Sequence, residues 1–406
     1  MIDRYLGISP KGDILLIKRL CQRLKGLSML HINSTREGGG VAEILQRMVP
    51  LLEGLEVAVR WEVIEGDNRF FDITKKIHNA LQGYPEEFTD EMWQYHYEIN
   101  RRNAKRIDLN ADMVFVHDPQ PAPLVDFRPD GKNIWIWRCH IDLSNPYKPV
   151  CDRLMKYYEK YDAGIYHVSK FARGAKAFEF IVPPSIDPLS EKNRELSDQE
   201  IQEVLERFQI PNDRPMILQV SRFDRFKDPI GVIKAYRIVK TYNDCILVLA
   251  GSPATDDPEG EQVLQEVRDY ASDDPDIKIL LLPPYSDRDI NALQRAATVV
   301  LQKSLKEGFG LTVSEAMWKG KPVIGGAVGG IPLQIIHRVT GFLVYSIEGA
   351  AFRIRQFLNN PEMTAKMGER GREHVRQNFL ITRQIRDYLS IWYYILKGGK
   401  RVLELG

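Results

Sequence analysis

Short apolar runs rich in Val and Ile alternate along this chain with longer segments whose apolar residues recur at helical spacing. The first runs cover residues 28–33, 57–64, 112–118, 133–139 and 164–169. The later runs cover residues 216–222, 245–251, 278–284, 298–304, 322–328 and 341–346. Because the runs are apolar on both faces, they are typical of strands that helices cover on both sides. The alternation predicts parallel sheets with right-handed crossovers.

A proline-rich segment separates the two sets of runs. Residues 181–193 hold three prolines among turn formers, and a fresh helical pattern begins near residue 197. Proline lacks the N–H that a central strand needs, so the segment is a predicted linker. We expect an α/β protein with two Rossmann-like, doubly wound parallel-sheet domains that face each other across a cleft. The predicted parts are residues 1–190, residues 191–380, and a C-terminal helix in 381–406 that packs back on the first domain.

Composition and charge exclude several classes of protein. The chain has 406 residues, which at about 150 residues per domain also favours two or three domains. Hydrophobic residues at 44% and charged residues at 27% exclude a disordered protein. The net charge of +1 gives no general reason to bind nucleic acid or an anionic membrane.

Targeting and cysteine patterns favour the cytoplasm. No run approaches the roughly 20 apolar residues that cross a bilayer, and the charged N-terminal segment does not resemble a secretory signal. The four cysteines are widely scattered and form no CxxC motif, so we expect no disulfide framework and no zinc site.

A glycine-broken loop leads into a predicted helix within residues 306–326. Gly308 and Gly310 allow positive φ and close backbone approach. The amides of Gly310, Leu311 and Thr312 would then be free at the start of the helix, where the dipole favours a phosphate.

Two carboxylates flank this predicted anion site. Glu307 lies in the loop, and Glu315 lies about one turn inside the helix. Each could accept hydrogen bonds from vicinal hydroxyls, which favours a ligand with hydroxyls at both ends and phosphate between, a nucleotide sugar. The alternative is that Glu315 complements the helix dipole at the surface and Glu307 is an ordinary loop charge.

A second strand end, in residues 219–228, carries several cations. Arg222 and Lys227 combine a fixed guanidinium with a mobile ammonium, which together can neutralise a diphosphate and stabilise it as a leaving group. Arg225 lies between them and could substitute for Arg222. The alternative is a solvated basic loop.

Three consecutive glycines, Gly38, Gly39 and Gly40, precede a helix expected near residue 41. They do not form GxGxxG, so a dinucleotide site is disfavoured. A flexible loop that can approach a sugar or phosphate is favoured over a plain turn. Gly251 ends another run and is a further candidate for lining the nucleotide.

Two histidines follow strands of the first predicted domain. His117 and His140 each stand near an aspartate, Asp118 and Asp142. Ligands of open α/β sheets bind at the carboxyl ends of strands, which favours binding positions for this pair. His167 is interpreted as a core residue. No HExxH or His/Cys cluster has the spacing of metal ligands, so no metal site is predicted.

The ordered set of motifs resembles the retaining family-4 glycosyltransferases of GT-B fold. The match extends from about residue 29 to 380 and includes the ending KPVIGGAVGGIPLQIIHRVTGFLV. The segments NSTREGGGVAEIL and VHDPQP…RCHIDLS look most like trehalose synthases of the glycosyltransferring type and the related trehalose phosphorylases. The set comprises the glycine loop, His140, R-x4-K at Arg222 and Lys227, and E-x7-E from Glu307 to Glu315.

The resemblance implies a role for each candidate. Four residues would be catalytic. His140 would lie against the sugar near its reacting carbon, Arg222 and Lys227 would bind the diphosphate, and Glu307 would bind glucose hydroxyls. Glu315 would bind the ribose. Ser221 departs from the family pattern, which leaves the choice between Arg222 and Arg225 open. The remaining implied substrate-binding residues are Gly38, Gly39, Gly40, Asp118, Asp142, Gly251, Gly308, Phe309, Gly310, Leu311 and Thr312.

The implied reaction is reversible, retaining transfer of glucose from UDP-, ADP- or GDP-glucose to free glucose, giving α,α-trehalose. Residues 1–190 would bind the acceptor and 191–380 the nucleotide sugar. Alternatives are a trehalose phosphorylase, a retaining glucosyltransferase with another acceptor, and a non-catalytic sugar-nucleotide sensor. A dehydrogenase is disfavoured because GxGxxG is missing.

The resemblance implies no obligatory cofactor, although Mg²⁺ carried by the nucleotide could affect activity. Sugars are the expected partners, with no nucleic acid and no membrane. The aromatic helix around Trp392 could pack on the first domain or on a second subunit, so a homodimer stays open.

Overall fold

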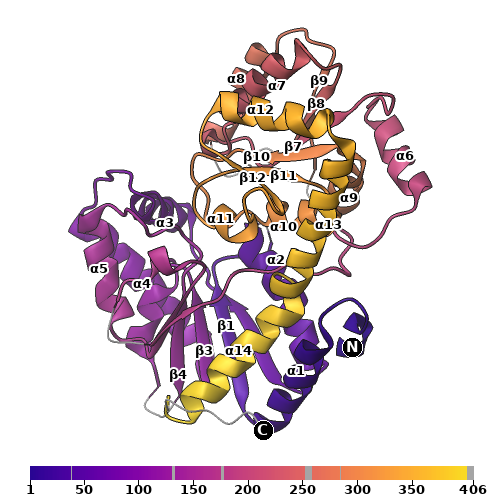
Figure 1. The fold of residues 1–406 in the computed structure, drawn as a ribbon. Helices are drawn as coiled ribbons and strands as arrows, with labels where there is room; N and C mark the ends of the chain where they lie inside the picture. The colour runs from indigo at the N-terminus through magenta and orange to yellow at the C-terminus, as the bar shows by residue number, and fades with distance from the viewer. Residues whose placement is uncertain (38, 130–132, 175–177, 252–257, 284, 400–406) are drawn as a thin grey trace. The chain divides into compact units, whose positions relative to one another are not determined.

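The computed structural model describes all residues except 38, 130–132, 175–177, 252–257, 284 and 400–406 (Figure 1). The chain forms two compact units: unit 1 is Met1–Ser185 with Ile381–Gly406, and unit 2 is Ile186–Leu380. The boundary predicted at residue 190 therefore lies within the first residues of unit 2. Within unit 2 the first residue lies beside the end of the segment, since the Ile186 N–H donates to the Phe379 carbonyl at 2.9 Å.

Unit 1 is built on a six-stranded parallel sheet of order β2-β1-β3-β4-β5-β6. Helices α1 and α14 pack against each other (Figure 1), and Tyr388 of α14 stacks on Phe115 of β3, so α14 covers one face. Phe70 of α3 and Trp93 of α4 join the apolar core on the other face. The strands are β1 Ser28–Asn33, β2 Ala58–Val63, β3 Met113–His117, β4 Ile134–Arg138, β5 Ala163–Tyr166 and β6 Phe178–Ile181. The helices are α1 Lys11–Arg23, α2 Gly39–Glu53, α3 Asn68–Leu81, α4 Asp90–Arg106, α5 Lys148–Tyr158 and α14 Ile381–Leu396, with short 3₁₀ turns at Ile2–Tyr5, Ala122–Phe127 and Ser169–Phe171.

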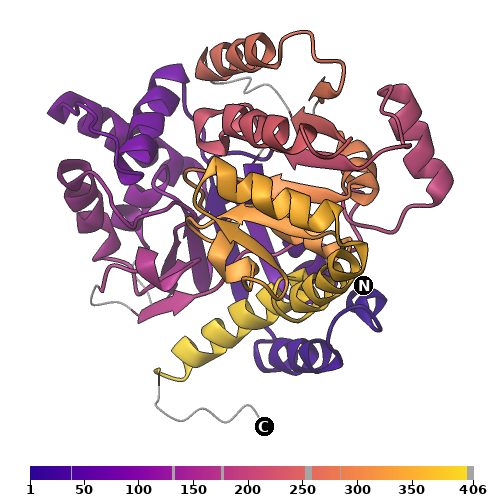
Figure 2. The same cartoon turned by 45° about the horizontal axis from the view of Figure 1, so that its top comes forward.

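Unit 2 repeats the plan with a parallel sheet of order β12-β11-β10-β7-β8-β9. Helices α7 and α12 pack side by side over one face (Figure 2). The strands are β7 Met216–Val220, β8 Ile246–Gly251, β9 Ile277–Leu281, β10 Val299–Gln302, β11 Val323–Gly326 and β12 Gly341–Val344. The helices are α6 Asp198–Arg207, α7 Pro229–Lys240, α8 Pro258–Ala271, α9 Asp287–Ala296, α10 Leu311–Trp318, α11 Ile331–Gln334, α12 Ile347–Leu358 and α13 Pro361–Asn378, with a 3₁₀ turn η4 at Arg225–Lys227.

The prediction of two doubly wound parallel sheets is confirmed, and every predicted apolar run overlaps a strand. One strand, β6 at Phe178–Ile181, was not predicted. It pairs only with β5 and its two end residues are exposed, so it lacks the continuous apolar character of a central strand. Among the helices of the described part of the chain, none is long and apolar enough to cross a membrane.

Candidate active site

Lys227 and Glu307 meet at the carboxyl ends of two neighbouring strands of unit 2. Lys227 closes the turn η4 after β7, and Glu307 lies in the loop after β10. Lys227 Nζ lies 2.6 Å from Glu307 Oε2, and the two side chains are only 17% and 9% exposed. The fold thus joins two predicted site residues that are 80 positions apart.

Two further donors hold the Glu307 carboxylate in place. Gln302 Nε2 and Ser304 Oγ donate to the same Oε2 atom at 3.2 and 3.1 Å. Since all three donors, Lys227 included, use Oε2, the other oxygen of Glu307 can accept a hydrogen bond from a ligand hydroxyl. The sequence interpretation missed Gln302 and Ser304. Their signal was their place at the carboxyl end of a predicted strand.

The loop after Glu307 delivers an uncapped helix start. Gly310 has a φ of +80°, a left-handed conformation that favours glycine, and α10 begins at the next residue without a side-chain cap. The first-turn amides of Leu311 and Thr312 have no acceptor one turn earlier in the helix, as at every helix start. The Gly308 carbonyl accepts from the Gly330 N–H at 3.1 Å, which fixes the loop from its other side.

Phe309 anchors this loop through its side chain. Its side chain is buried, with its ring centroid 5.7 Å from that of Phe379. Gln334 Nε2 donates to the Phe309 carbonyl at 2.5 Å. A ligand can therefore meet only the backbone of Phe309, although the sequence interpretation placed it among the binding residues.

Glu315 is buried in α10 and lies on no solvated surface, so the alternative of a surface residue is wrong. Its Oε2 accepts from Gln294 Nε2 at 3.3 Å, and its Oε1 lies 3.9 Å from Lys192 Nζ. Lys192 belongs to the segment interpreted as a linker, which is why its approach to Glu315 was not foreseen.

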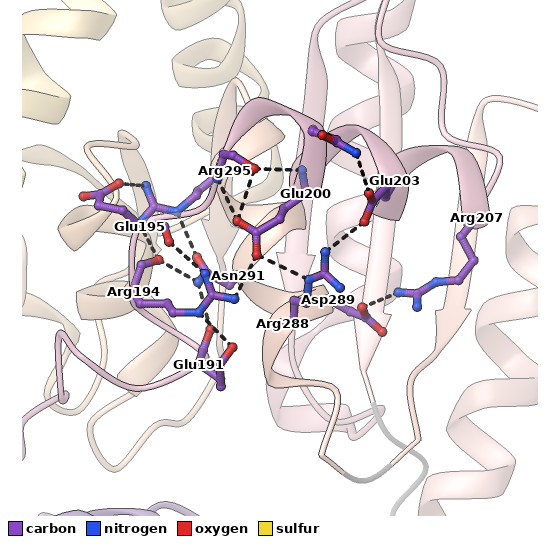
Figure 3. A network of polar contacts seen from close by, with 12 residues as sticks. Glu191, Arg194, Glu195, Glu200, Glu203, Arg207, Arg288, Asp289, Asn291 and Arg295 are labelled. Atoms are coloured by element: carbon purple, nitrogen blue, oxygen red, sulfur yellow. Dashed lines mark hydrogen bonds and ion pairs between the residues drawn. The ribbon is translucent and has the colours of Figure 1, made fainter.

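A polar network fixes the backbone on both sides of Lys192. Figure 3 shows the side chains that join this segment to α6 and α9. Asn291 Nδ2 donates to the carbonyls of Glu191 and Arg194, each at 2.9 Å. The guanidinium of Arg194 pairs with Glu200, also at 2.9 Å. Lys192 is therefore held beside Glu315 by its neighbours' contacts.

The two candidate arginines have different surroundings. Arg225 is paired with Glu266 of α8 at 2.8 Å. Arg222 lies 3.6 Å from Asp224 in a looser pair, and its side chain is 56% exposed. The Arg225 side chain is similarly exposed, at 52%, so the two arginines differ in the length of the contact with the partner carboxylate and not in exposure.

Gly251 has a packing reason of its own. A Cβ atom at this position would lie 1.7 Å from the Ser221 carbonyl oxygen, so any side chain would push apart the ends of β7 and β8. In unit 1, Gly39 has a φ of +79° and starts α2, and Gly40 follows in the helix. Gly38 lies outside the described residues.

The candidates of unit 1 form a second group. His117 Nδ1 lies 3.0 Å from His140 Nε2, and Asp118 Oδ1 accepts from the His140 backbone N–H at 2.6 Å. Burial raises the pKa of Asp118 to about 7, opposed by that backbone hydrogen bond and by the charge of Arg138. Asp142 accepts from the Ser144 N–H at 2.8 Å and so shapes its own loop.

Two more histidines join this group. His31 Nδ1 lies 3.1 Å from His117 Nε2, and His167 Nε2 lies 3.2 Å from His140 Nδ1. His31 was hidden inside a predicted strand, and His167 was interpreted as a core residue. Across the described part of the chain, no group of His, Cys, Asp and Glu side chains is arranged to hold a metal ion.

Each half of the chain matches a known protein family. Residues 31–173 match the family "Trehalose synthase, N-terminal domain", and residues 200–374 match "Glycosyl transferases group 1". The chain is 46% identical over 396 residues to a trehalose synthase of Pyrococcus horikoshii, covering 96% of this chain and 95% of that protein. It is 44% identical over 390 residues to a trehalose synthase of Rubrobacter xylanophilus, covering 94% and 93%. A trehalose phosphorylase of Pleurotus pulmonarius is 29% identical, covering 87% of this chain and 55% of that protein.

Solved structures show the same architecture. An α,α-trehalose-phosphate synthase of Burkholderia xenovorans, in complex with glucose-6-phosphate, has a TM-score of 0.70 at 14% identity and covers 90% of this chain and 99% of its own. The Anabaena protein HepE, in complex with UDP and glucose, has a TM-score of 0.69 at 15% identity and also covers 90% and 99%. At these identities the likeness shows the fold alone, which is the GT-B fold that the motifs predicted.

Proposed function

Because this chain belongs to the trehalose synthase family of group 1 glycosyltransferases, we propose that it transfers glucose from a nucleoside diphosphate glucose to the anomeric hydroxyl of free glucose. The product would be α,α-trehalose, with retention at the donor carbon. The family supports a glycosyltransferase of trehalose metabolism, and the donor, acceptor and stereochemistry are the proposed part. The observation that carries the proposal is the 2.6 Å contact of Lys227 with Glu307 beside the uncapped start of α10.

This arrangement suits a nucleotide sugar. Lys227 and Arg222 would neutralise the diphosphate, and the first amides of α10 would bind its oxygens. The free oxygen of Glu307 would accept a glucose hydroxyl. Glu315 would receive the ribose hydroxyls by exchanging its long, 3.9 Å contact with Lys192 for shorter hydrogen bonds.

Transfer then needs little more than positioning and charge stabilisation. The bond from the anomeric carbon to the phosphate oxygen breaks, and the acceptor oxygen bonds to that carbon from the same face. The acceptor's proton passes to the departing phosphate oxygen. Lys227 and Arg222 stabilise the charge that develops on this leaving group. Because these cations serve the diphosphate, no metal ion is required, although Mg²⁺ carried by the nucleotide can modify the rate.

The test is an incubation of the protein with glucose and UDP-, ADP- or GDP-glucose, followed by NMR of the products. The proposal expects a 1,1-linked disaccharide with both anomeric centres α, together with one released nucleoside diphosphate per disaccharide. Another linkage, or hydrolysis alone, would overturn the trehalose assignment.

A trehalose phosphorylase is the second candidate, supported only by the more distant relatives. Incubation of trehalose with inorganic phosphate separates the two, because a phosphorylase releases glucose 1-phosphate without any nucleotide. The proposed enzyme would instead degrade trehalose only when a nucleoside diphosphate is added.

A further inference from the structure

Four histidines on neighbouring strands of unit 1 form one hydrogen-bonded row. His31 lies in β1, His117 ends β3, and His140 and His167 follow β4 and β5, which are neighbours in that order. The successive ring nitrogens are 3.1, 3.0 and 3.2 Å apart. His31, His117 and His167 are buried, whereas His140 is half-buried. His140 is therefore the member of the row that a ligand can reach.

A sulfur atom at the inner end sets the direction of the row. Met29 Sδ lies 3.1 Å from His31 Nε2. A thioether has no proton to donate, so in a hydrogen bond between these two atoms His31 Nε2 is the donor and His31 Nδ1 is left to accept. His117 then donates through Nε2 and accepts through Nδ1, and the same assignment passes to His140 and His167. The row is consistent with four neutral rings, each protonated on Nε2.

The surroundings of the row oppose a positive charge. Burial lowers the pKa of His31 to about 3. Burial, and then the neighbouring histidine and Arg138, hold the pKa of His117 well below its ordinary value. The pKa of His140 is likewise held far down by burial, by Arg138 and by its two histidine neighbours. The other ionisable groups around the row are Asp118, Cys139, Tyr388 and Arg383.

We propose that His31, His117 and His167 are positioning residues that keep the His140 imidazole neutral, in its Nε2–H form and in one orientation at the carboxyl end of β4. This inference rests on the proposed function for what His140 contacts, a sugar. The row does not conduct protons, because its inner end stops at a thioether. Both nitrogens of His140 are engaged within the row, so the ring meets a sugar through its carbon atoms and is no general acid or base.

The first test needs no substrate. Long-range ¹H–¹⁵N NMR of the ligand-free protein distinguishes the two neutral tautomers and the charged ring, and single substitutions assign the signals of the eight histidines. We expect His31, His117 and His140 to remain neutral Nε2–H rings between pH 8 and pH 5. An Nδ1–H ring among these three, or titration near an ordinary pKa of about 6.5, would overturn the proposal.

The second test breaks the row and measures both His140 and turnover. His117→Phe keeps a planar ring but removes both nitrogens, and His117→Gln restores a donor and an acceptor. We expect His117→Phe to lower kcat about 100-fold, as a small misplacement of a positioned group does, with KM for the donor changed less than about threefold. His117→Gln should recover part of kcat, and the His140 signal should lose its single Nε2–H form only in His117→Phe.

Tyr388→Phe is the matched control, because the Tyr388 ring stacks 6.3 Å from that of His31 while its hydroxyl accepts a hydrogen bond from Gln384 Nε2 at 3.3 Å. It should leave kcat within about twofold, since the stacking is retained. Should His117→Phe fold poorly, Met29→Leu removes the sulfur at nearly constant volume and should mix the tautomers of His31.

An unchanged kcat and an unchanged His140 signal in folded His117→Phe would overturn the positioning role. If the wild-type protein forms no disaccharide at all, the proposed function fails, and the NMR signatures still decide whether the row fixes His140.

Discussion

Replacing Glu307 with Gln is expected to separate donor binding from glucosyl transfer. Lys227 Nζ lies 2.6 Å from Glu307 Oε2, so the ammonium must release or share this carboxylate when it binds a diphosphate. Gln keeps the shape of the side chain but removes the negative charge. Lys227 then loses a competitor for the diphosphate, while the sugar loses a charged hydrogen-bond acceptor.

The burial of the pair sets the size of these effects. Exposed ion pairs contribute about 0–1 kcal/mol, and breaking a fully buried pair costs about 3–5 kcal/mol. With side chains 17% and 9% exposed, the Lys227–Glu307 pair lies between these limits, so we expect a loss of about 2 kcal/mol in the free energy of unfolding. UDP should bind as tightly as before or up to about tenfold more tightly. Turnover should fall by about 10²–10³ because a group positioned for the transition state is lost.

Three measurements on one preparation check this prediction: UDP affinity by calorimetry, kcat by release of nucleoside diphosphate, and the free energy of unfolding by urea. Asp228→Asn is the matched control, since Asp228 pairs with Lys303 in the same unit and the side chains are 19% and 8% exposed. Asn can keep the N-cap hydrogen bond to the Gly231 N–H. The control should lose comparable stability with little change in UDP affinity or kcat.

The opposite result for Glu307→Gln would refute this reasoning. A tenfold weaker affinity for UDP with an unchanged kcat would mean that the carboxylate serves the nucleotide and not the sugar. Tight UDP binding by a wild-type protein that shows no turnover would favour the sensor over the enzyme.

Three further outcomes are expected. Arg222→Ala should weaken UDP binding about tenfold, and the loss should be larger at low than at high salt. Arg225→Ala should change the affinity for UDP less than about twofold, because Arg225 is already paired with Glu266 of α8. Equal effects of the two substitutions in a calorimetric titration would contradict this difference. Addition of EDTA to an assay without added metal should leave most of the transfer activity. A complete loss of activity that Mg²⁺ restores would show that Lys227 and Arg222 do not suffice to stabilise the diphosphate. The free energy of unfolding should fall as the pH drops from about 6.5 to 5, by up to about 1.4 kcal/mol per pH unit for each of His31, His117 and His140, because their pKa values are lowered by folding and the unfolded chain takes up the protons first. Asp118, whose pKa folding raises to about 7, acts in the opposite direction over this range and offsets one of the three. Urea titrations at pH 5 and 7 check this slope, which should shrink in His31→Gln.

The sequence predicted the parts of this protein whose signal is local. A central strand that is buried on both faces is an unbroken apolar run in the sequence. The start of helix α10 is indicated by Gly310 and the polar loop before it. The strand β6 was not predicted, because an edge strand with exposed residues needs no unbroken apolar run. The approach of Lys192 to Glu315 was not predicted for another reason. It depends on hydrogen bonds from α9 to the backbone around Lys192, and no pattern of residue types encodes those contacts.

The histidine row is an intermediate case between local signals and contacts that no pattern encodes. The four histidines are visible in the sequence, but they can be recognised as one row only when the order of the strands is known. Its members are 86, 23 and 27 positions apart, and β2 separates β1 from β3 in the chain though not in the sheet. Neighbouring strands lie about 4.8 Å apart. The ring centroids along the row are 5.3, 5.3 and 5.2 Å apart, close to that spacing. The row runs diagonally across the sheet, because the register places His31 opposite Phe115 and His117 opposite Arg138. Each of these two steps therefore advances by two residues and stays on one face of the sheet. Once the strand order and the register are known, histidines offset by two residues on one face should be interpreted together as one polar row, and not one by one as core residues.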